Sequence, residues 1–411
     1  MTRPLLALML AVTVAGCDTS SGSSETTPTV IELSATARDV VAQSNAFGVG
    51  LFAETAAGQP GNLMLSPLGA SAALTMLLNG ADGETAAQIR DVLGYAGSDL
   101  DAVNQAYRSL TGQLLAADPA VQFALANAVF YDRQSSQGSP FKPTFLAAMD
   151  GPFGARVEGL DFLAPASVDV VNRWAEESTN GRVPKVLAEI NRDDVLYLLN
   201  ALYYKGAWST PFDPDRTAPA DFRLADGRTV RVPTMAASVP AITVRGEGYA
   251  ALELPYGRRN FSMVVLVPDG DAPLAGFADD LRDGLWTDAA ARLDAQTAWP
   301  ETIVRLPRFS FSYEKALNDQ LRALGMVEAF TDAADLTRMN DDPRLLVTLV
   351  KQNTFVEVNE EGTEAAAVTT VGVGITSAPP SFAVDRPFVF AIRERTTGAL
   401  LFIGQVADPS S

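Results

Sequence analysis

The alternation of apolar and polar residues is most regular near the end of the chain. Residues 345–359 (LLVTLVKQNTFVEVN) alternate as a strand with one buried face does. Two short apolar runs, residues 387–390 and 400–403, flank the turn residues Thr396-Thr397-Gly398 and predict a β-hairpin. We therefore expect the chain to end in strands.

The connection between these strands, residues 360–385, is much longer than the ~4–6 residues that usually join two elements. Long loops are usually functional or disordered, and disordered ones are rich in charge and proline. Residues 365–376 contain neither, and the side chains on one face of this segment are all small or β-branched: Thr363, Ala365, Ala367, Thr369 and Val371. This pattern favours a segment that can join a sheet over a low-complexity linker.

The remainder of the chain predicts helices first and strands afterwards, an order that is typical of α+β folds. Helices are expected at residues 33–53, 66–78, 85–93, 100–116, 168–178 and 313–324. Strands are expected at residues 123–131, 195–204, 251–255, 261–268 and 302–311. Ser34 and Ser66-Pro67 suit the first two helix starts, because serine caps free amides and proline fits the first turn.

Several of these stretches resemble the serpin family. The segment Glu360-Glu361-Gly362-Thr363-Glu364-Ala365-Ala366-Ala367 resembles the proximal hinge, which is the base of the serpin reactive-centre loop. Residues 385–393 resemble the strand after that loop, and four more stretches match in family order: residues 62–68, 83–89, 171–181 and 200–208. The resemblance covers roughly residues 34–408. It implies one α+β domain with a large, mainly antiparallel central sheet, about eight to nine helices, smaller sheets and an exposed reactive-centre loop near residues 360–385.

The resemblance also assigns a polar contact to the top of the main sheet, a region called the breach. Glu360 is expected to pair there with Arg308, beside Trp208, although serpins usually have a lysine at the arginine position. Two unrelated surface charges are the alternative for the pair, and such charges contribute little to stability. Simple core packing is the alternative for Trp208.

A second polar cluster, called the shutter, is expected beneath the part of the sheet that opens. Ser66, Asn200 and Gln352 correspond to it, and buried polar groups of this kind need hydrogen-bond partners. Many serpins have a histidine where this chain has Gln352, and Gly69 replaces a common serine. We therefore expect the network to exist but its energetics to differ from those of other serpins.

Counting along the loop indicates the bond that a protease would cut. The count from Thr363 and the count back from Pro387 both give Thr376–Ser377, with Ile375–Thr376 as the runner-up. Thr376 is small and β-branched, which suits an elastase-like or subtilisin-like protease better than a trypsin-like one. The resemblance thus implies a serine protease inhibitor that acts as a suicide substrate and is not itself an enzyme. A cysteine protease is the alternative target.

Three other functions compete with this interpretation. A non-inhibitory serpin with a chaperone, carrier or storage role would usually carry bulky, charged or proline residues in the hinge, whereas Ala365-Ala366-Ala367 is intact. A surface lipoprotein that binds a small ligand leaves the loop pattern unexplained. A hydrolase with a Ser-His-Asp or Cys-His site is excluded because the chain contains no histidine.

Composition and net charge exclude several classes of binding partner. The 411 residues are 47% hydrophobic and 19% charged, as in ordinary globular proteins. The net charge of −18 argues against nucleic acid and against a basic membrane-binding patch. Residues 99–119 contain one basic residue, Arg108, so no glycosaminoglycan site is expected on a helix that carries one in some serpins. We expect a monomer with neither a metal nor a cofactor.

The N-terminus is expected to direct export. Arg3 precedes an apolar run at residues 5–14 that is too short to span a bilayer. Val14-Ala15-Gly16-Cys17 resembles a bacterial lipobox, in which the cysteine is lipidated. Residues 1–16 would then be a signal peptide and residues 17–33 a lipid-anchored, flexible tether before the serpin domain at 34–408.

Cys17 is the only cysteine, so no intrachain disulfide can form. We expect an exported lipoprotein that is anchored to a membrane, in the periplasm or at the cell surface. With an ordinary secretory signal and an incidental cysteine, the protein would instead be extracellular.

Overall fold

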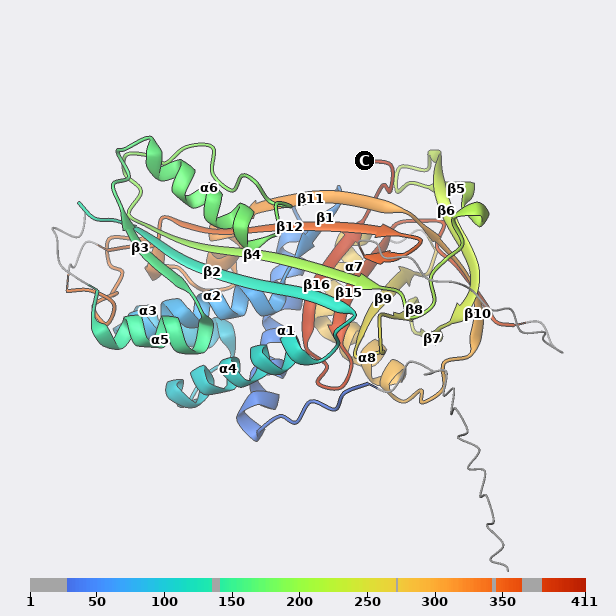
Figure 1. Cartoon of the computed structure of the whole chain (residues 1–411), viewed down its shortest axis with the longest axis horizontal. Coiled ribbons are helices and arrows are strands. Elements are labelled where there is room, and N and C mark those ends of the chain that lie inside the picture. Colours follow the sequence, from blue (N-terminus) through green and yellow to red (C-terminus); the bar gives the residue numbers. More distant parts are fainter. Residues whose placement is uncertain (1–27, 135–140, 271–272, 342–344, 364–378) are drawn as a thin grey trace, which may run out of the picture.

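The computed structural model describes residues 28–134, 141–270, 273–341, 345–363 and 379–411. Within these ranges the chain forms nine α-helices and three β-sheets (Figure 1). The helices are α1 (Ala35–Ala56), α2 (Pro67–Gly80), α3 (Gly83–Leu93), α4 (Leu100–Ala116), α5 (Pro143–Phe153), α6 (Ala166–Ser178), α7 (Leu274–Asp280), α8 (Trp286–Asp294) and α9 (Asn318–Ala323).

The main sheet has six strands in the order β11-β12-β13-β4-β2-β3 and is mostly antiparallel. These strands are β11 (Phe309–Ala316), β12 (Leu349–Asn359), β13 (Gly362–Thr363), β4 (Leu196–Ala207), β2 (Val121–Asp132) and β3 (Arg156–Leu160). The second sheet contains β1 (Leu63–Leu65), β16 (Leu400–Val406), β15 (Phe388–Glu394), β9 (Phe261–Pro268), β8 (Tyr249–Pro255) and β7 (Ile242–Gly246). The third contains β14 (Ser381–Ala383), β10 (Glu301–Pro307), β6 (Thr229–Pro240) and β5 (Ala218–Arg223).

The main sheet lies between two layers of helices. Figure 1 shows α6 above this sheet and α2 to α5 beneath it. On the upper side, Trp174 of α6 packs edge-on against Phe130 of β2, with ring centroids 5.8 Å apart. On the lower side, α2 is buried along nearly its whole length, which suits a sequence that is apolar or small on every face. The α+β architecture expected from the sequence is therefore confirmed.

Local sequence signals explain where the first helices begin. The Ser34 hydroxyl accepts a hydrogen bond from the amide of Ala37 at 3.1 Å, and Ser66 does the same for Gly69 at 3.1 Å. Pro67 occupies the first turn of α2, where its missing amide hydrogen costs nothing. Both predicted caps are thus present.

The region around Pro307 was wrongly predicted. A single strand at 302–311 and a helix at 313–324 were expected, but β10 ends at Pro307 and β11 begins at Phe309 in a different sheet. The alternation of aromatic and polar residues continues through β11, which pairs along its whole length with β12. This pairing overrides the local helical preference, so only the short α9 remains helical. The strand predicted from residue 345 likewise starts later, at Leu349.

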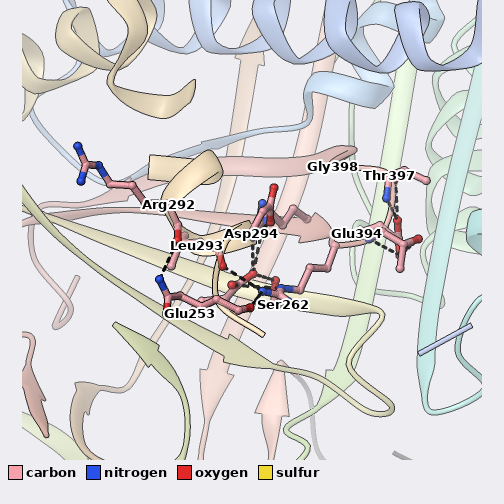
Figure 2. A network of polar contacts seen from close by, with 12 residues as sticks. Glu253, Ser262, Arg292, Leu293, Asp294, Glu394, Thr397 and Gly398 are labelled. Atoms are coloured by element: carbon pink, nitrogen blue, oxygen red, sulfur yellow. Dashed lines mark hydrogen bonds and ion pairs between the residues drawn. The ribbon is translucent and has the colours of Figure 1, made fainter. Parts of the chain in front are cut away.

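A buried network of charges ties the second sheet to α8 (Figure 2). Arg393 of β15 is 1% exposed and donates to Glu253 Oε1 of β8 from Nε and Nη2, at 3.0 and 2.8 Å. Its Nη2 also donates to Asp294 Oδ1 at the end of α8, at 2.8 Å. Glu394, the next residue, accepts from the amides in the β15–β16 turn. These paired charges hold β15, β8 and α8 together.

Candidate functional site

Two residues of the predicted hinge, Gly362 and Thr363, lie inside the main sheet. Strand β13 consists of Gly362 and Thr363 and sits between the ends of β12 and β4. Thr363 pairs with Val358 on one side and Gly206 on the other, in antiparallel register with both. The chain therefore turns back at Glu360-Glu361 and begins a new strand in the middle of the sheet.

Glycine at position 362 is what allows this close approach. Its φ is +145°, and a Cβ atom there would lie 2.1 Å from the carbonyl oxygen of Gly206. Any larger residue would push β13 away from β4, because the obstacle is backbone and cannot rotate aside. The glycine in the hinge motif is thus a steric requirement of this site.

Below β13, the two neighbouring strands meet directly. Residues 349–353 of β12 pair in parallel with residues 197–201 of β4, and Gln352 lies opposite Asn200. Figure 1 shows these two strands side by side through the middle of the sheet. Within the described part of the sheet, their direct pairing ends at Asn353 and Ala201, several residues short of β13. Strands β12 and β4 are thus paired directly at one end and separated at the other, where Gly362 and Thr363 lie between them. We call this separation of the two strands the fork.

Glu360 is held at the top of the fork by contacts with three residues that lie between secondary-structure elements. Its Oε1 accepts a hydrogen bond from the Thr217 hydroxyl at 2.6 Å and lies 3.6 Å from Arg308 Nη1. Its carbonyl oxygen accepts from the amide of Phe212 at 2.8 Å. The Glu360 side chain is 8% exposed and that of Arg308 is 47% exposed, so the ion pair is partly screened by water. Glu360 and Arg308 are thus in contact, and their role in a breach stays a prediction.

Trp208 and Tyr256 form an aromatic layer beside the hinge. The two rings stack with centroids 4.4 Å apart and planes 7° apart. The indole Nε1 of Trp208 donates to the carbonyl oxygen of Asn359 at 2.9 Å, at the end of β12. The Tyr256 hydroxyl lies 2.6 Å from Thr363 Oγ1, and both residues are buried. Burial raises the pKa of Tyr256 far above its ordinary value, so this hydroxyl stays protonated near neutral pH.

The three residues expected at the shutter meet beneath the closed part of the fork. Gln352 accepts from the amide of Ser66 at 2.6 Å and donates to the Ser66 carbonyl and to Asn200 Oδ1, each at 3.1 Å. Asn200 in turn donates to Asn127 Oδ1 of β2 at 2.8 Å. A Cβ atom at Gly69 would lie 2.3 Å from Asn200 Oδ1, so the glycine makes room for this amide. The cluster links α2 to three neighbouring strands of the main sheet.

Some contacts at the site were not predicted. Thr217, Tyr256 and Asn127 each bond to an expected site residue from a segment far away in the sequence, and no local pattern marks them. Other expected residues lie outside the described part of the chain: Cys17, Glu364, Ala365, Ala366, Ala367, Ile375, Thr376 and Ser377.

The described residues carry no sign of a metal site or of a membrane-spanning helix. They contain no cluster of three or more acidic or cysteine side chains suited to a metal ion. No helix among them has the length and apolar character needed to cross a bilayer.

Comparisons with known proteins identify the family. A family model described as "Serpin (serine protease inhibitor)" matches residues 42–409. The leukocyte elastase inhibitor of Sus scrofa is 32% identical over 387 residues, which cover 90% of this chain and 99% of that protein. The crystal structure of tengpin, a thermophilic serpin, in its native state matches with a TM-score of 0.82 at 26% identity, over 92% of this chain and 96% of the other.

A structure of thyroxine-binding globulin complexed with thyroxine also matches, with a TM-score of 0.80, over 90% of this chain and 99% of the other. At 23% identity, this match shows a likeness of fold alone. The chain belongs to the serpin family, which is described as a family of serine protease inhibitors and also includes non-inhibitory members. Both an elastase inhibitor and a thyroxine-binding protein are among its neighbours.

Proposed function

We propose that the protein inhibits serine proteases as a suicide substrate, by inserting its reactive-centre loop into the main sheet. The observation that carries the proposal is the position of β13 between β12 and β4. This position brings the base of the long loop to the entrance of a fork in the main sheet, from which the rest of the loop could be inserted. The small residues that follow Thr363 in the sequence suit burial in that fork.

The strand registers support this route for the loop. If the segment continues from Thr363 in the same antiparallel register, Ala365 meets Tyr204 and Val356, and Ala367 meets Leu202 and Thr354. Thr369 then arrives opposite both Asn200 and Gln352. These two shutter residues already face each other across the parallel ladder, so the two registers agree. In the proposed mechanism, Thr369 separates this pair and supplies a hydroxyl group to the shutter.

The chemistry belongs to the target protease. Its serine attacks the carbonyl carbon of Thr376, the bond to Ser377 breaks, and an acyl-enzyme ester links the protease to Thr376. The freed loop from Thr363 to Thr376 enters the sheet and, at ~3.3 Å per residue, spans about 45 Å. The attached protease is carried along and its catalytic groups are displaced, so hydrolysis of the ester stalls. This chain contributes the scissile bond and the receiving sheet.

We also propose an elastase-like or subtilisin-like target. Thr376 is small, and the similar protein from Sus scrofa is named a leukocyte elastase inhibitor. Trypsin carries a buried acid in its specificity pocket, which threonine would leave unpaired. A chymotrypsin-like pocket would be underfilled, at a cost of about 1–3 kcal/mol.

The test is to mix the purified protein with an elastase, a subtilisin, a chymotrypsin and a trypsin. We expect a covalent complex that survives SDS, formed fastest with the first two enzymes. Mass spectrometry of the released C-terminal fragment should show Ser377 at its start, or Thr376 if the neighbouring bond is cut. Cleavage of the loop without any stable complex would instead support the non-inhibitory alternative.

For its location we propose a lipid anchor at Cys17, based on the resemblance of residues 14–17 to a lipobox. Acyl chains of this kind hold a protein firmly only when several are present. The C17S variant should therefore move from the membrane fraction to the soluble fraction. A wild-type protein that is already soluble and carries no lipid by mass spectrometry would refute the anchor.

A further inference from the structure

The side chain of Tyr256 connects two sheets through one hydrogen bond. Its backbone directly follows β8 of the second sheet, whereas its hydroxyl bonds to Thr363 in the main sheet, at 2.6 Å. Tyr256 is 0% exposed and Thr363 is 2% exposed, so water cannot replace either partner. Loss of one hydroxyl would leave the other buried without a partner, which is costly.

The tyrosine ring is held rigidly in place. Trp208 stacks on one face, and the amide of Tyr256 donates to the carbonyl of Phe261 at 2.8 Å. The following turn is fixed by Asp118, whose Oδ2 accepts from the amide of Arg258 at 2.6 Å. The hydroxyl is therefore positioned before the hinge arrives, and little conformational freedom is lost when the bond forms.

The bond exists only while Thr363 is in the sheet. In the insertion route, later residues of the loop add below Thr363, so Thr363 keeps its position from the start of insertion to the end. The hydroxyl of Tyr256 thus stabilises every inserted state and no state in which the hinge has left the sheet.

We propose that Tyr256 is a positioning residue for loop insertion: it retains Thr363 in the fork and so favours insertion over hydrolysis of the acyl-enzyme. This role rests on the inhibitory function proposed above. Without the hydroxyl, the hinge spends more time outside the sheet. Insertion after cleavage then starts later, and the protease has more time to hydrolyse the ester and escape.

The chain offers a matched control for a test. Tyr204 of β4 is also buried, and its ring lies 5.4 Å from that of Tyr256. Its hydroxyl has no hydrogen-bond partner among the described residues. Y204F therefore removes the same atom from the same aromatic cluster without removing a hydrogen bond.

The first experiment uses the free protein. Hydrogen–deuterium exchange of the peptide that contains Gly362 and Thr363 is compared in the wild type, Y256F, Y204F and T363S. We expect exchange to be about tenfold faster in Y256F, because one buried hydrogen bond is lost. Exchange should be unchanged in Y204F and in T363S, which keeps the hydroxyl.

The second experiment measures the reaction with elastase. In Y256F, the number of inhibitor molecules consumed per trapped protease should rise several-fold, while the rate of loop cleavage stays at the wild-type value. A general loss of folding would also raise this number, but it would change the rate of loop cleavage as well. T363V probes the same bond from the other side and should behave like Y256F. The double variant leaves no unpaired hydroxyl, so its effect should be smaller than the sum of the two single effects.

The proposal is overturned if Y256F and Y204F show the same hydrogen exchange and the same number of inhibitor molecules consumed per trapped protease. It is also overturned if the effects of Y256F and T363V simply add in the double variant. The exchange experiment needs no protease. If the wild type traps no protease at all, the inhibitory function fails, yet the exchange comparison still decides whether Tyr256 retains the hinge.

Discussion

At the scale of single residues, the hinge positions inside the main sheet, Gly362 and Thr363, require residues that tolerate complete burial without charge. Thr363 is 2% exposed and pairs with strands on both sides, with its hydroxyl directed at Tyr256. The preceding residue, Gly362, has no space for a side chain. In the proposed mechanism, these two positions therefore decide whether the loop can begin to insert.

We expect T363R to convert the inhibitor into a substrate. A buried, unpaired charge costs several kcal/mol, so arginine would keep the hinge out of the fork and delay insertion after cleavage. Gel analysis with elastase should then show normal loop cleavage but no SDS-stable complex, whereas T363S should still form the complex. Full inhibition by T363R would refute insertion as the mechanism.

The buried charges of the second sheet lead to a prediction about stability. In E253A, Arg393 would stay buried with only Asp294 as a charged partner, and Arg395 would lose its contact with Glu253 as well. Breaking a buried pair costs about 3–5 kcal/mol, so the free energy of unfolding should fall by this amount in urea titrations. D226A is the control, because its pair with Arg228 is exposed and contributes little. Equal stabilities of E253A and D226A would contradict the prediction.

At the scale of secondary-structure elements, the sequence predicted those features that depend on residues close together in the chain. The serine caps of α1 and α2 were found in the sequence because a cap bonds to an amide three residues away. Strand β11 was missed because its pairing with β12 lies beyond any local window. The same limit hid Tyr256, whose partner Thr363 is 107 residues away. Arg308 and Gln352 were predicted through the family resemblance, not from a local pattern.

Cleavage of the reactive-centre loop should raise the stability of the whole domain. Among the described residues, Gly362 and Thr363 of the hinge lie in the fork between β4 and β12. In the proposed mechanism, a cut near Thr376 would free the loop to fill the fork as a strand, and the intact form would be held kinetically above this more stable state. We expect the unfolding temperature to increase by roughly 10 °C or more after limited proteolysis, as measured by calorimetry. Cleavage in a T363R background should give a smaller increase, and an unchanged midpoint in the wild type would point to a non-inhibitory member.

At the scale of the whole molecule, the pH dependence of stability follows from the absence of histidine and from the burial of several tyrosines. There is no histidine, so no side chain has an unperturbed pKa between 5 and 8. Tyrosines are buried throughout the main core, and burial raises the pKa of Tyr204 and Tyr256 well above the ordinary value. Burial also raises the pKa of Tyr313 on β11 to about 12. Stability should therefore respond to alkali rather than to changes near neutrality.

We expect the free energy of unfolding to be constant between about pH 6 and 9 and to fall steeply above pH 10. Below the unfolded pKa of about 10, a buried tyrosine keeps its proton in both states, and its stabilising contribution is fully present. Above it, the unfolded chain loses the proton first, so each fully buried tyrosine lowers stability by about 1.4 kcal/mol per pH unit. Urea titrations at several pH values, with tyrosinate absorbance as a second signal, would measure this slope. Y204F removes one such group and should show a shallower slope, whereas a loss of stability already between pH 6 and 8 would contradict the argument.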